Sequence, residues 1–489
     1  MKYLSLFSIF TTLLLCACSY NITIDNKSVH QPTITPDYKE VTIPCNIAPI
    51  HFTMPDSCNV SRLHAIYHAG DMTYALDDKD GQIAPSAEIW HSLLKASDSL
   101  QVTLFAETNG QWTEYAPFDI YIKHDKIDPY ITYRLIEPGY ETWNEMGIYQ
   151  RCLENFEEND VLTNKMKGYG CMNCHSFRKH NPDSMLFHLR VDYGGTYIIT
   201  NGNIEKLNTK TPQTEYALVY PSWHPDGKYI AFSVNNTKQM FHTTDINRIE
   251  VMDFASNVVV YDVECHKIIT SHRLFSPKAF ETFPTFSPDG KTLYFCSADS
   301  VPMPNDYRDV KYSLCAIAFD TETRTFGDIV DTLYNARTNN KSVSFPRISP
   351  DGKHLMFTLS DYGNFSIWHK EADLYMVSLN NDSIFPLSTL NSNDVESYHS
   401  WSSNSRWVIF SSRRDNGLYT QPFIAYIDSC GNAHKPFLLP QEEKGYYDSL
   451  MKSFNIPEFT TGNVRTTPYE LSTIAKRERG VDVSFGGFR

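Results

Sequence analysis

The sharpest chemical signal in this 489-residue chain is the run Cys171-Met172-Asn173-Cys174-His175. Two thiols separated by two residues can add across the two vinyl groups of a haem, and a histidine directly after them can bind the iron from the proximal side. Cys171 and Cys174 are therefore predicted to attach one haem c covalently, with His175 as the proximal iron ligand. A redox disulfide, a zinc site and an incidental pattern are the alternatives, although the surrounding sequence lacks a thioredoxin-like βαβ pattern and a second metal-binding pair.

A distal ligand for the haem iron is suggested at His188. If Pro182 begins a turn equivalent to the one at Pro225, His188 falls at the position that Ala231 holds in the next repeat. A histidine at that place is either the sixth iron ligand or a core histidine bonded to a backbone carbonyl, and the core role is the commoner one. The weaker candidates for the distal position are Met166, Met185, Met240 and His242.

A turn of the type Pro-Asp-Gly, followed by a short apolar run, recurs along the second half of the chain. Its copies begin at residues 182, 225, 288, 350 and 403, with degenerate sequence at the first and the last, so they lie 43, 63, 62 and 53 residues apart. Proline fixes φ, Asp and Gly close a tight turn, and the apolar run forms a buried strand. Each interval can hold a four-stranded blade, so we expect an all-β propeller with five recognisable blades and a sixth completed by irregular sequence, for example the segment after Tyr446.

These repeats resemble the propeller repeats of the periplasmic translocation protein TolB, over roughly residues 175–440. More widely, the chain is similar to a family of Bacteroidetes lipoproteins that are described as TolB-like or cytochrome c-like. That similarity runs from residues 133–140 through the CxxCH motif to residues 455–459. It implies the architecture, and it implies that residues 176–180 take the place of a first blade strand, so that a haem would lie near one mouth of the propeller.

The N-terminus has the layout of an export signal. A charged Met1-Lys2 precedes an apolar stretch that ends in Leu15-Cys16-Ala17-Cys18, which resembles the bacterial lipobox. We expect a signal peptide over residues 1–17, lipid attachment at Cys18, and a place in the bacterial cell envelope as an outer-membrane lipoprotein facing the periplasm. A cleaved signal with an incidental cysteine is the alternative. The net charge of −14, without Lys/Arg runs, argues against nucleic acid as a partner.

The segment between the tether and the propeller changes its period. An immunoglobulin-like β-sandwich is expected where apolar and polar residues alternate around a turn at Asn109-Gly110. Apolar residues recur every three or four positions over residues 141–160, which predicts a short linker helix. In order, the expected units are the tether (18–37), the sandwich (38–130), the linker (131–170), the propeller (171–445) and a C-terminal tail (446–489).

These features together predict an electron-transfer or redox-sensing protein, in which the propeller docks a single haem c against an unidentified redox or protein partner. The alternatives are a haem-dependent enzyme with its substrate at the propeller mouth, and a TolB-type binding scaffold without haem. No catalytic residue is assigned, because no Ser-His-Asp order or nucleophile elbow is visible. Glu281 and Glu396 each lie seven residues before a repeat turn, where solvated or turn-capping carboxylates are commoner than acid-base groups.

Overall fold

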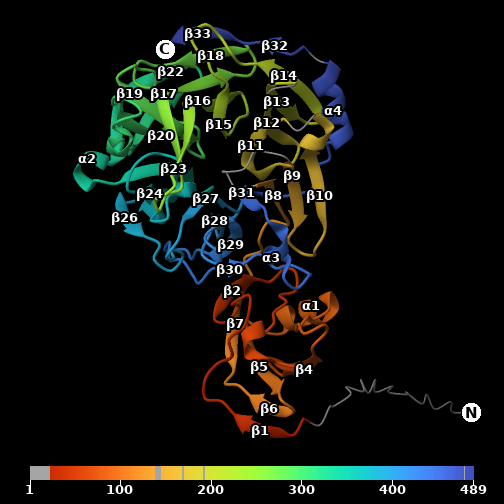
Figure 1. The fold of residues 1–489 in the computed structure, drawn as a ribbon. Helices are drawn as coiled ribbons and strands as arrows, with labels where there is room; N and C mark the ends of the chain where they lie inside the picture. Colours follow the sequence, from red (N-terminus) through yellow and green to blue (C-terminus); the bar gives the residue numbers. More distant parts are fainter. Residues whose placement is uncertain (1–21, 138–144, 168–169, 191–192, 478) are drawn as a thin grey trace, which may run out of the picture.

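Six antiparallel sheets surround a central axis as the blades of a β-propeller in the computed structural model, which describes residues 22–489 apart from 138–144, 168–169, 191–192 and 478 (Figure 1). The first strand of each blade contacts the first strands of both neighbouring blades, so these six inner strands line the axis. The expected all-β propeller is confirmed, with six blades. Blade 1 consists of β11 (Met172–Phe177), β12 (Ser184–Leu189), β13 (Gly195–Thr200) and β14 (Asn203–Asn208), and blade 2 of β15 (Leu218–Trp223), β16 (Tyr229–Phe241), β17 (Ile249–Asp262) and β18 (Lys267–Thr270). Blade 3 consists of β19 (Ala279–Phe286), β20 (Thr292–Asp299), β21 (Ser313–Asp320) and β22 (Thr325–Tyr334), and blade 4 of β23 (Ser342–Ile348), β24 (His354–Ser360), β25 (Asp373–Ser378) and β26 (Ser383–Pro386). Blade 5 consists of β27 (Glu396–Trp401), β28 (Trp407–Ser412), β29 (Gln421–Tyr426) and β30 (Phe437–Leu438), and blade 6 of β31 (Ser453–Thr460), β8 (Tyr130–Ile136), β9 (Gly147–Cys152) and β10 (Glu158–Thr163).

Blade 6 closes the ring by joining the two ends of the propeller sequence. Its inner strand β31 comes from the segment after Tyr446, and it pairs antiparallel with β8, which precedes the other five blades in the chain. The helix expected over residues 141–160 is wrong for its described part, because residues 147–152 and 158–163 are strands β9 and β10. The spacing that predicted a helix crosses the turn after Cys152, and pairing with the distant β31 decides the structure. The propeller therefore begins at Tyr130 and includes part of the expected linker and tail.

The N-terminal domain is a seven-stranded sheet with one helix. The ten-residue strand β5 pairs with β3 along one edge and with both β6 and β7 along the other, so all seven strands form one connected sheet. This differs from the two separate sheets of an immunoglobulin-like sandwich. The elements of this domain are β1 (Ile24–Lys27), β2 (Val41–Pro44), β3 (Arg62–Ala69), β4 (Met72–Asp77), α1 (Ala87–Ala96), β5 (Ser99–Thr108), β6 (Gln111–Glu114) and β7 (Phe118–Lys123).

The N-terminal domain is joined to the propeller by a continuous core. One cluster of buried side chains includes Trp90 of α1, Trp407 of blade 5 and Phe454 of blade 6. At the edge of this cluster, Asp128 accepts hydrogen bonds from the backbone and the hydroxyl of Ser403, in the repeat turn of blade 5. The domain is thus packed rigidly against the propeller rather than tethered to it.

The C-terminal tail wraps the outside of the propeller (Figure 1). Helix α4 (Pro468–Arg477) contacts β10 and β14, after which β32 (Val481–Asp482) and β33 (Ser484–Phe488) add parallel strands to the outer edges of blades 1 and 2. The tail therefore bridges the junctions between blades 6, 1 and 2. The remaining helices are α2 (Ala336–Asn339) and α3 (Tyr446–Leu450). Among the described residues, no helix is both long enough and apolar enough to span a bilayer.

Truncating Phe454 should destabilise the ring closure. This side chain of β31 is fully buried, and its ring centroid lies 4.6 Å from that of Tyr133 in β8. We expect Phe454→Ala to lower the free energy of unfolding by about 3–5 kcal/mol, because it leaves a cavity between the strands that close the ring. Phe241→Ala, at a side chain 54% exposed, should change it by less than about 0.5 kcal/mol. Equal effects in urea denaturation would contradict this role of β31.

Candidate functional site

Every inner strand contains a β-bulge at the same place. The first residue of the bulge has φ between 49° and 51° in five blades, at Tyr220, Phe283, Phe345, Tyr398 and Ile456. A bulge inserts an extra residue and bends the strand, so the residues that follow it are turned relative to the sheet. The register between first and second strands shifts between Asn173 and Ser176, Val219 and Ser222, Thr282 and Thr285, Ser344 and Arg347, Ser397 and Ser400, and Asn455 and Glu458 in blades 1 to 6.

Aromatic side chains at the first bulge position form a plug across the axis. The ring centroids of Tyr220 and Phe283 are 4.4 Å apart, those of Phe283 and Phe345 are 4.1 Å apart, and those of Phe345 and Tyr398 are 4.7 Å apart. We call these four residues the aromatic plug. Tyr220 also lies 6.1 Å from Phe345, two blades away, so the rings meet across the channel. In blade 1, the register assigns this bulge position to Cys174.

The second bulge position is proline in four blades and histidine in the other two. His175 of blade 1 and His399 of blade 5 are each 3% exposed. The Nε2 of His175 donates to the carbonyl of Thr132 at 3.3 Å, and the Nε2 of His399 donates to the carbonyl of Met356 at 3.0 Å. Both carbonyls belong to the second strand of the preceding blade. Thr132 lies opposite Glu458, and Met356 lies opposite Arg347, next to the bulge of that blade. The two histidines therefore have the same role, because each links two adjacent blades by a hydrogen bond.

The environment of these imidazoles keeps them neutral. Burial lowers the pKa of His175 to about 4, with a further contribution from Arg134, and burial lowers the pKa of His399 to about 3. An uncharged imidazole is the form that donates to a carbonyl without a desolvation penalty for charge. The Nε2 atom of His175 thus has a packing role between blades, whereas its buried Nδ1 atom has no hydrogen-bond partner among the described residues.

The structure leaves the predicted covalent haem untested, because the side chain of Cys174 lies outside its description. The Nε2 atom of His175 points at a backbone carbonyl between two blades, and Cys171 is half-buried against the apolar cluster between blades 6 and 1. No step is therefore derived through an iron centre. The predicted haem stays a prediction, and the predicted lipidation site Cys18 lies outside the described residues.

His188 lies in a different environment from His175. The Nδ1 atom of His188 is 2.9 Å from the hydroxyl of Thr196, and the His188 ring packs against Phe232 of blade 2. His188 lies opposite Asn173 on the neighbouring strand β12, and its buried Nε2 atom has no hydrogen-bond partner in the described part of the chain. Of the weaker candidates, Met185 lies in the core between blades 6 and 1, whereas Met240 and His242 lie on the extended hairpin of blade 2.

The sequence alignment that made His188 equivalent to Ala231 is offset by two residues. In the sheet, Ala231 pairs with Ser222, and the equivalent pair in blade 1 is Leu186 with Ser176. His188 therefore corresponds to a position that is polar or small in other blades. The turn of blade 1 is one residue longer than the others, which a comparison of turn sequences does not show. The residues equivalent to His188 in blades 2 to 6 are Ser233, Cys296, Thr358, Ser411 and Arg134.

The third bulge position supplies one polar residue from each blade to a single cavity of about 170 Å³. This cavity opens at the end of the axis where the inner strands end, which we call the near mouth. Arg347 and Glu458 are the two charged members, and the other four are hydroxyl residues. We call this set the polar ring; it consists of Ser176, Ser222, Thr285, Arg347, Ser400 and Glu458.

Hydrogen bonds between neighbouring inner strands fix the polar ring. The indole of Trp223 donates to the carbonyl of Ser176 at 3.3 Å, and the indole of Trp401 donates to the carbonyl of Arg347 at 3.1 Å. Glu458 accepts the backbone N–H of Phe177 at 3.1 Å. Burial raises the pKa of Glu458 to about 7, despite the opposing effects of that hydrogen bond and of Arg347. This carboxyl can therefore be a donor or an acceptor near neutral pH.

Sequence reasoning missed the polar ring, although part of its signal was in view. Ile456-Pro457-Glu458 follows the same order as Phe345-Pro346-Arg347, and aligning these runs rather than the turns identifies the ring. Glu396 is held by Arg414 at 2.9 Å, so it is a paired structural carboxylate. Glu281, at the equivalent place in blade 3, is 2% exposed and its Oε2 has no hydrogen-bond partner. The described part of the chain contains no cluster of three His, Cys, Asp or Glu side chains that could hold a metal ion.

Comparison with known proteins gives limited further information. No protein-family model matches the chain. One curated relative, "Putative Tricorn-like protease C-terminal subunit" of Sulfurisphaera tokodaii, is 27% identical over 134 residues, which are 23% of this chain and 15% of that protein. The match thus spans less than a sixth of the relative's length.

Several solved structures resemble the chain at low sequence identity. An oligogalacturonate lyase in complex with manganese has a TM-score of 0.35 at 9% identity, covering 63% of this chain and 73% of its own. The tricorn protease has a TM-score of 0.32 at 11% identity, covering 71% and 33%, and the apo form of prolyl oligopeptidase B from Galerina marginata has 0.36 at 11%, covering 62% and 43%. At these scores they carry no argument about activity.

Proposed function

We propose that this chain is a lipid-anchored binding protein, whose propeller holds one side chain of a protein partner in the near-mouth cavity. The observation that carries the proposal is the polar ring, to which each of the six blades contributes one residue from the same bulge position. Such a ring presents converging hydrogen-bonding groups at the end of a rigid channel, an arrangement typical of a recognition pocket.

The size of the cavity favours a macromolecular partner. Pockets for drug-sized ligands have volumes of about 300–1,000 Å³, whereas this one measures about 170 Å³. A volume of this order admits a group the size of one side chain. Interfaces commonly derive much of their binding energy from a single anchor side chain in such a pocket. The surrounding near-mouth turns would then contact the rest of the partner.

The charges of the ring favour a polar anchor. Arg347 offers donors to a carbonyl or carboxylate, and Glu458 offers a carboxyl whose pKa is near 7. Trp223 and Trp401 flank these groups and supply apolar walls. Lipid attachment at Cys18 would hold this mouth at a membrane surface in the cell envelope, which is part of the proposal.

A haem-bearing redox protein is the competing function. It rests on the CxxCH sequence, while the neutral, inter-blade position of His175 supports the scaffold instead.

Site-specific photo-crosslinking tests the binding function. A photoreactive residue at Ser222, in the polar ring, should form an adduct with a partner protein in cells that express the anchored chain. The same residue at Ile329, which is 74% exposed on the outer strand β22, should not. Arg347→Ala should abolish the Ser222 adduct, because it removes the ring's cationic donor. Equal adducts at both positions, or an adduct that survives Arg347→Ala, would contradict the proposal.

Matched substitutions test the packing role of the motif histidine. His175→Ala and His399→Ala should each lower the free energy of unfolding by about 1–3 kcal/mol, because each leaves a buried carbonyl without its donor. The glutamine variants, which keep an N–H donor, should recover part of that loss in chemical denaturation. If His175→Ala were neutral while His399→Ala was costly, His175 would not be holding the blades.

A further inference from the structure

Blade 2 extends well beyond its neighbours at the end of the axis opposite the near mouth. Strands β16 and β17 are 13 and 14 residues long, whereas the inner strand β15 pairs with β16 only as far as Val234. Beyond Val234, the two strands pair only with each other. We call residues 235–253 the strap, since this hairpin passes over the far end of blade 3 and reaches blade 4.

Polar contacts attach the strap to both blades. Asp245 forms an ion pair with Arg308, in the β20–β21 loop of blade 3. Asn247 donates to the hydroxyl of Tyr362 at 3.4 Å and accepts the backbone N–H of Lys370 at 3.3 Å, both in the β24–β25 loop of blade 4. Asp253 accepts a hydrogen bond from Asn364 at 2.6 Å in the same loop.

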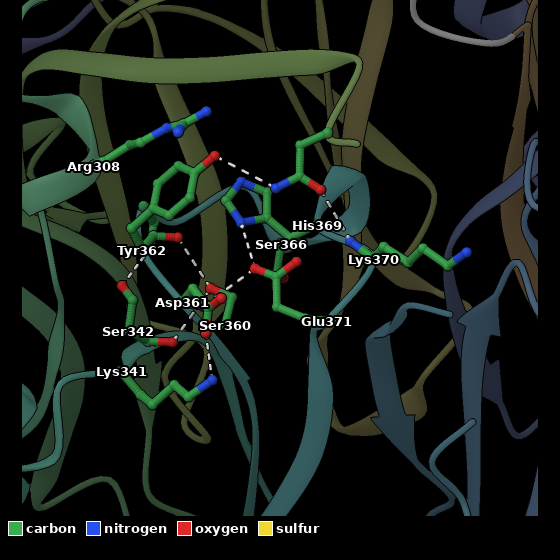
Figure 2. Close-up of polar contacts among 12 residues, drawn as sticks. Arg308, Lys341, Ser342, Ser360, Asp361, Tyr362, Ser366, His369, Lys370 and Glu371 are labelled. Carbon is green, nitrogen blue, oxygen red and sulfur yellow. Dashed lines mark hydrogen bonds and ion pairs between the residues drawn. The ribbon is translucent and has the colours of Figure 1, made fainter. Parts of the chain in front are cut away.

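A histidine between two glutamates lies at the centre of this junction. The Nε2 atom of His369 is 3.5 Å from Glu250 of the strap, and its Nδ1 atom is 3.3 Å from Glu371 of blade 4. Figure 2 shows the His369 ring facing the carboxylate of Glu371, with Tyr362 beside it and Arg308 over Tyr362. The hydroxyl of Tyr362 donates to Glu250. The side chains of His369 and Glu250 are only 3% and 2% exposed.

Removing the positive charge from this site would leave the buried carboxylate of Glu250 and the half-buried carboxylate of Glu371 without a cation between them. Burial favours the neutral imidazole of His369, but the hydrogen bonds and charges of Glu250 and Glu371 outweigh this effect and raise the pKa of His369 to about 9. In turn, His369 lowers the pKa of Glu371 to about 2, although burial alone would raise it. The stabilisation is thus complete below the ordinary histidine pKa of about 6.5 and is lost as the pH rises through about 9. The other titratable or charged groups around the junction are His242, Asp245, Asp253, Tyr307, Arg308, Lys341, Asp361, Tyr362 and Asp373.

We propose that the strap is a lid over the far end of the propeller and that the His369 imidazolium, shared between Glu250 and Glu371, is the latch that keeps it closed. Without that charge, the strap loses its central attachment to blade 4 and swings away as a hairpin, because its strands pair only with each other. Opening exposes the small cavity beneath it, of about 20 Å³, which Glu250, Asp253 and Tyr362 line. The proposal does not depend on the near-mouth binding function.

Hydrogen exchange followed by mass spectrometry tests the latch on the full chain. His369→Gln should raise exchange in residues 235–253 about tenfold or more, because it breaks a buried charge pair, with little change elsewhere. Glu250→Gln should have the same local effect. The matched control is His224→Gln, which alters a buried histidine paired with Asp226 at 2.7 Å in the near-mouth turn of the same blade; it should leave the strap protected.

The wild-type chain provides a second measurement that needs no variant. After correction for base-catalysed exchange, protection of residues 235–253 should fall between pH 8 and pH 10, across the pKa of about 9, and this fall should be absent in His369→Gln. Unchanged strap protection in both variants, or a rise in exchange spread evenly over all six blades, would overturn the proposal. If the variants fail to fold, a pH-independent strap in the wild-type chain would overturn it equally.

Discussion

The β-bulge in each inner strand is the constraint on which the rest of this site depends. At the first bulge position, aromatic side chains of blades 2 to 5 meet across the axis. At the second position, His175 and His399 bond to the preceding blade, and at the third position all six blades line the near-mouth cavity. Because the ring closes only when β31 pairs with β8, the six bulges align at one height and the polar ring forms. The residue at the third bulge position of each blade therefore determines the chemistry available at the near mouth.

The same constraint gives a physical reading of the CxxCH motif. In four blades the second bulge position is proline, which has no N–H and a fixed φ. In the other two blades it is His175 or His399, whose side chain donates to a carbonyl of the preceding blade. Burial lowers the pKa of both histidines and keeps them neutral, and the buried Nδ1 atom of each has no hydrogen-bond partner within the residues that the structure describes.

Much of the fold could be predicted from the sequence, because Pro-Asp-Gly turns and the apolar runs after them are local signals. Five blades follow from these turns alone. Blade 6 could not be predicted with its correct strands, since β31 and β8 are more than 300 residues apart in the chain and their pairing overrides the local period of residues 147–163. The site was predicted incorrectly for a related reason. Aligning the turns misplaced His188, whereas aligning the bulges places the backbone positions of Cys174, His175 and Ser176 correctly. The buried Glu250–His369–Glu371 junction had no sequence signal, because its members meet only through the length of a hairpin.

The proposal of a binding protein depends on the packing role of His175 between blades, and haem attachment at the CxxCH motif is the competing prediction. The most direct test is the intact mass and visible spectrum of the chain produced together with a c-type haem attachment system. The account predicts a colourless protein whose mass is that of the processed polypeptide and its lipid. A mass increased by one haem, with a c-type absorption band that survives acid-acetone extraction, would contradict it.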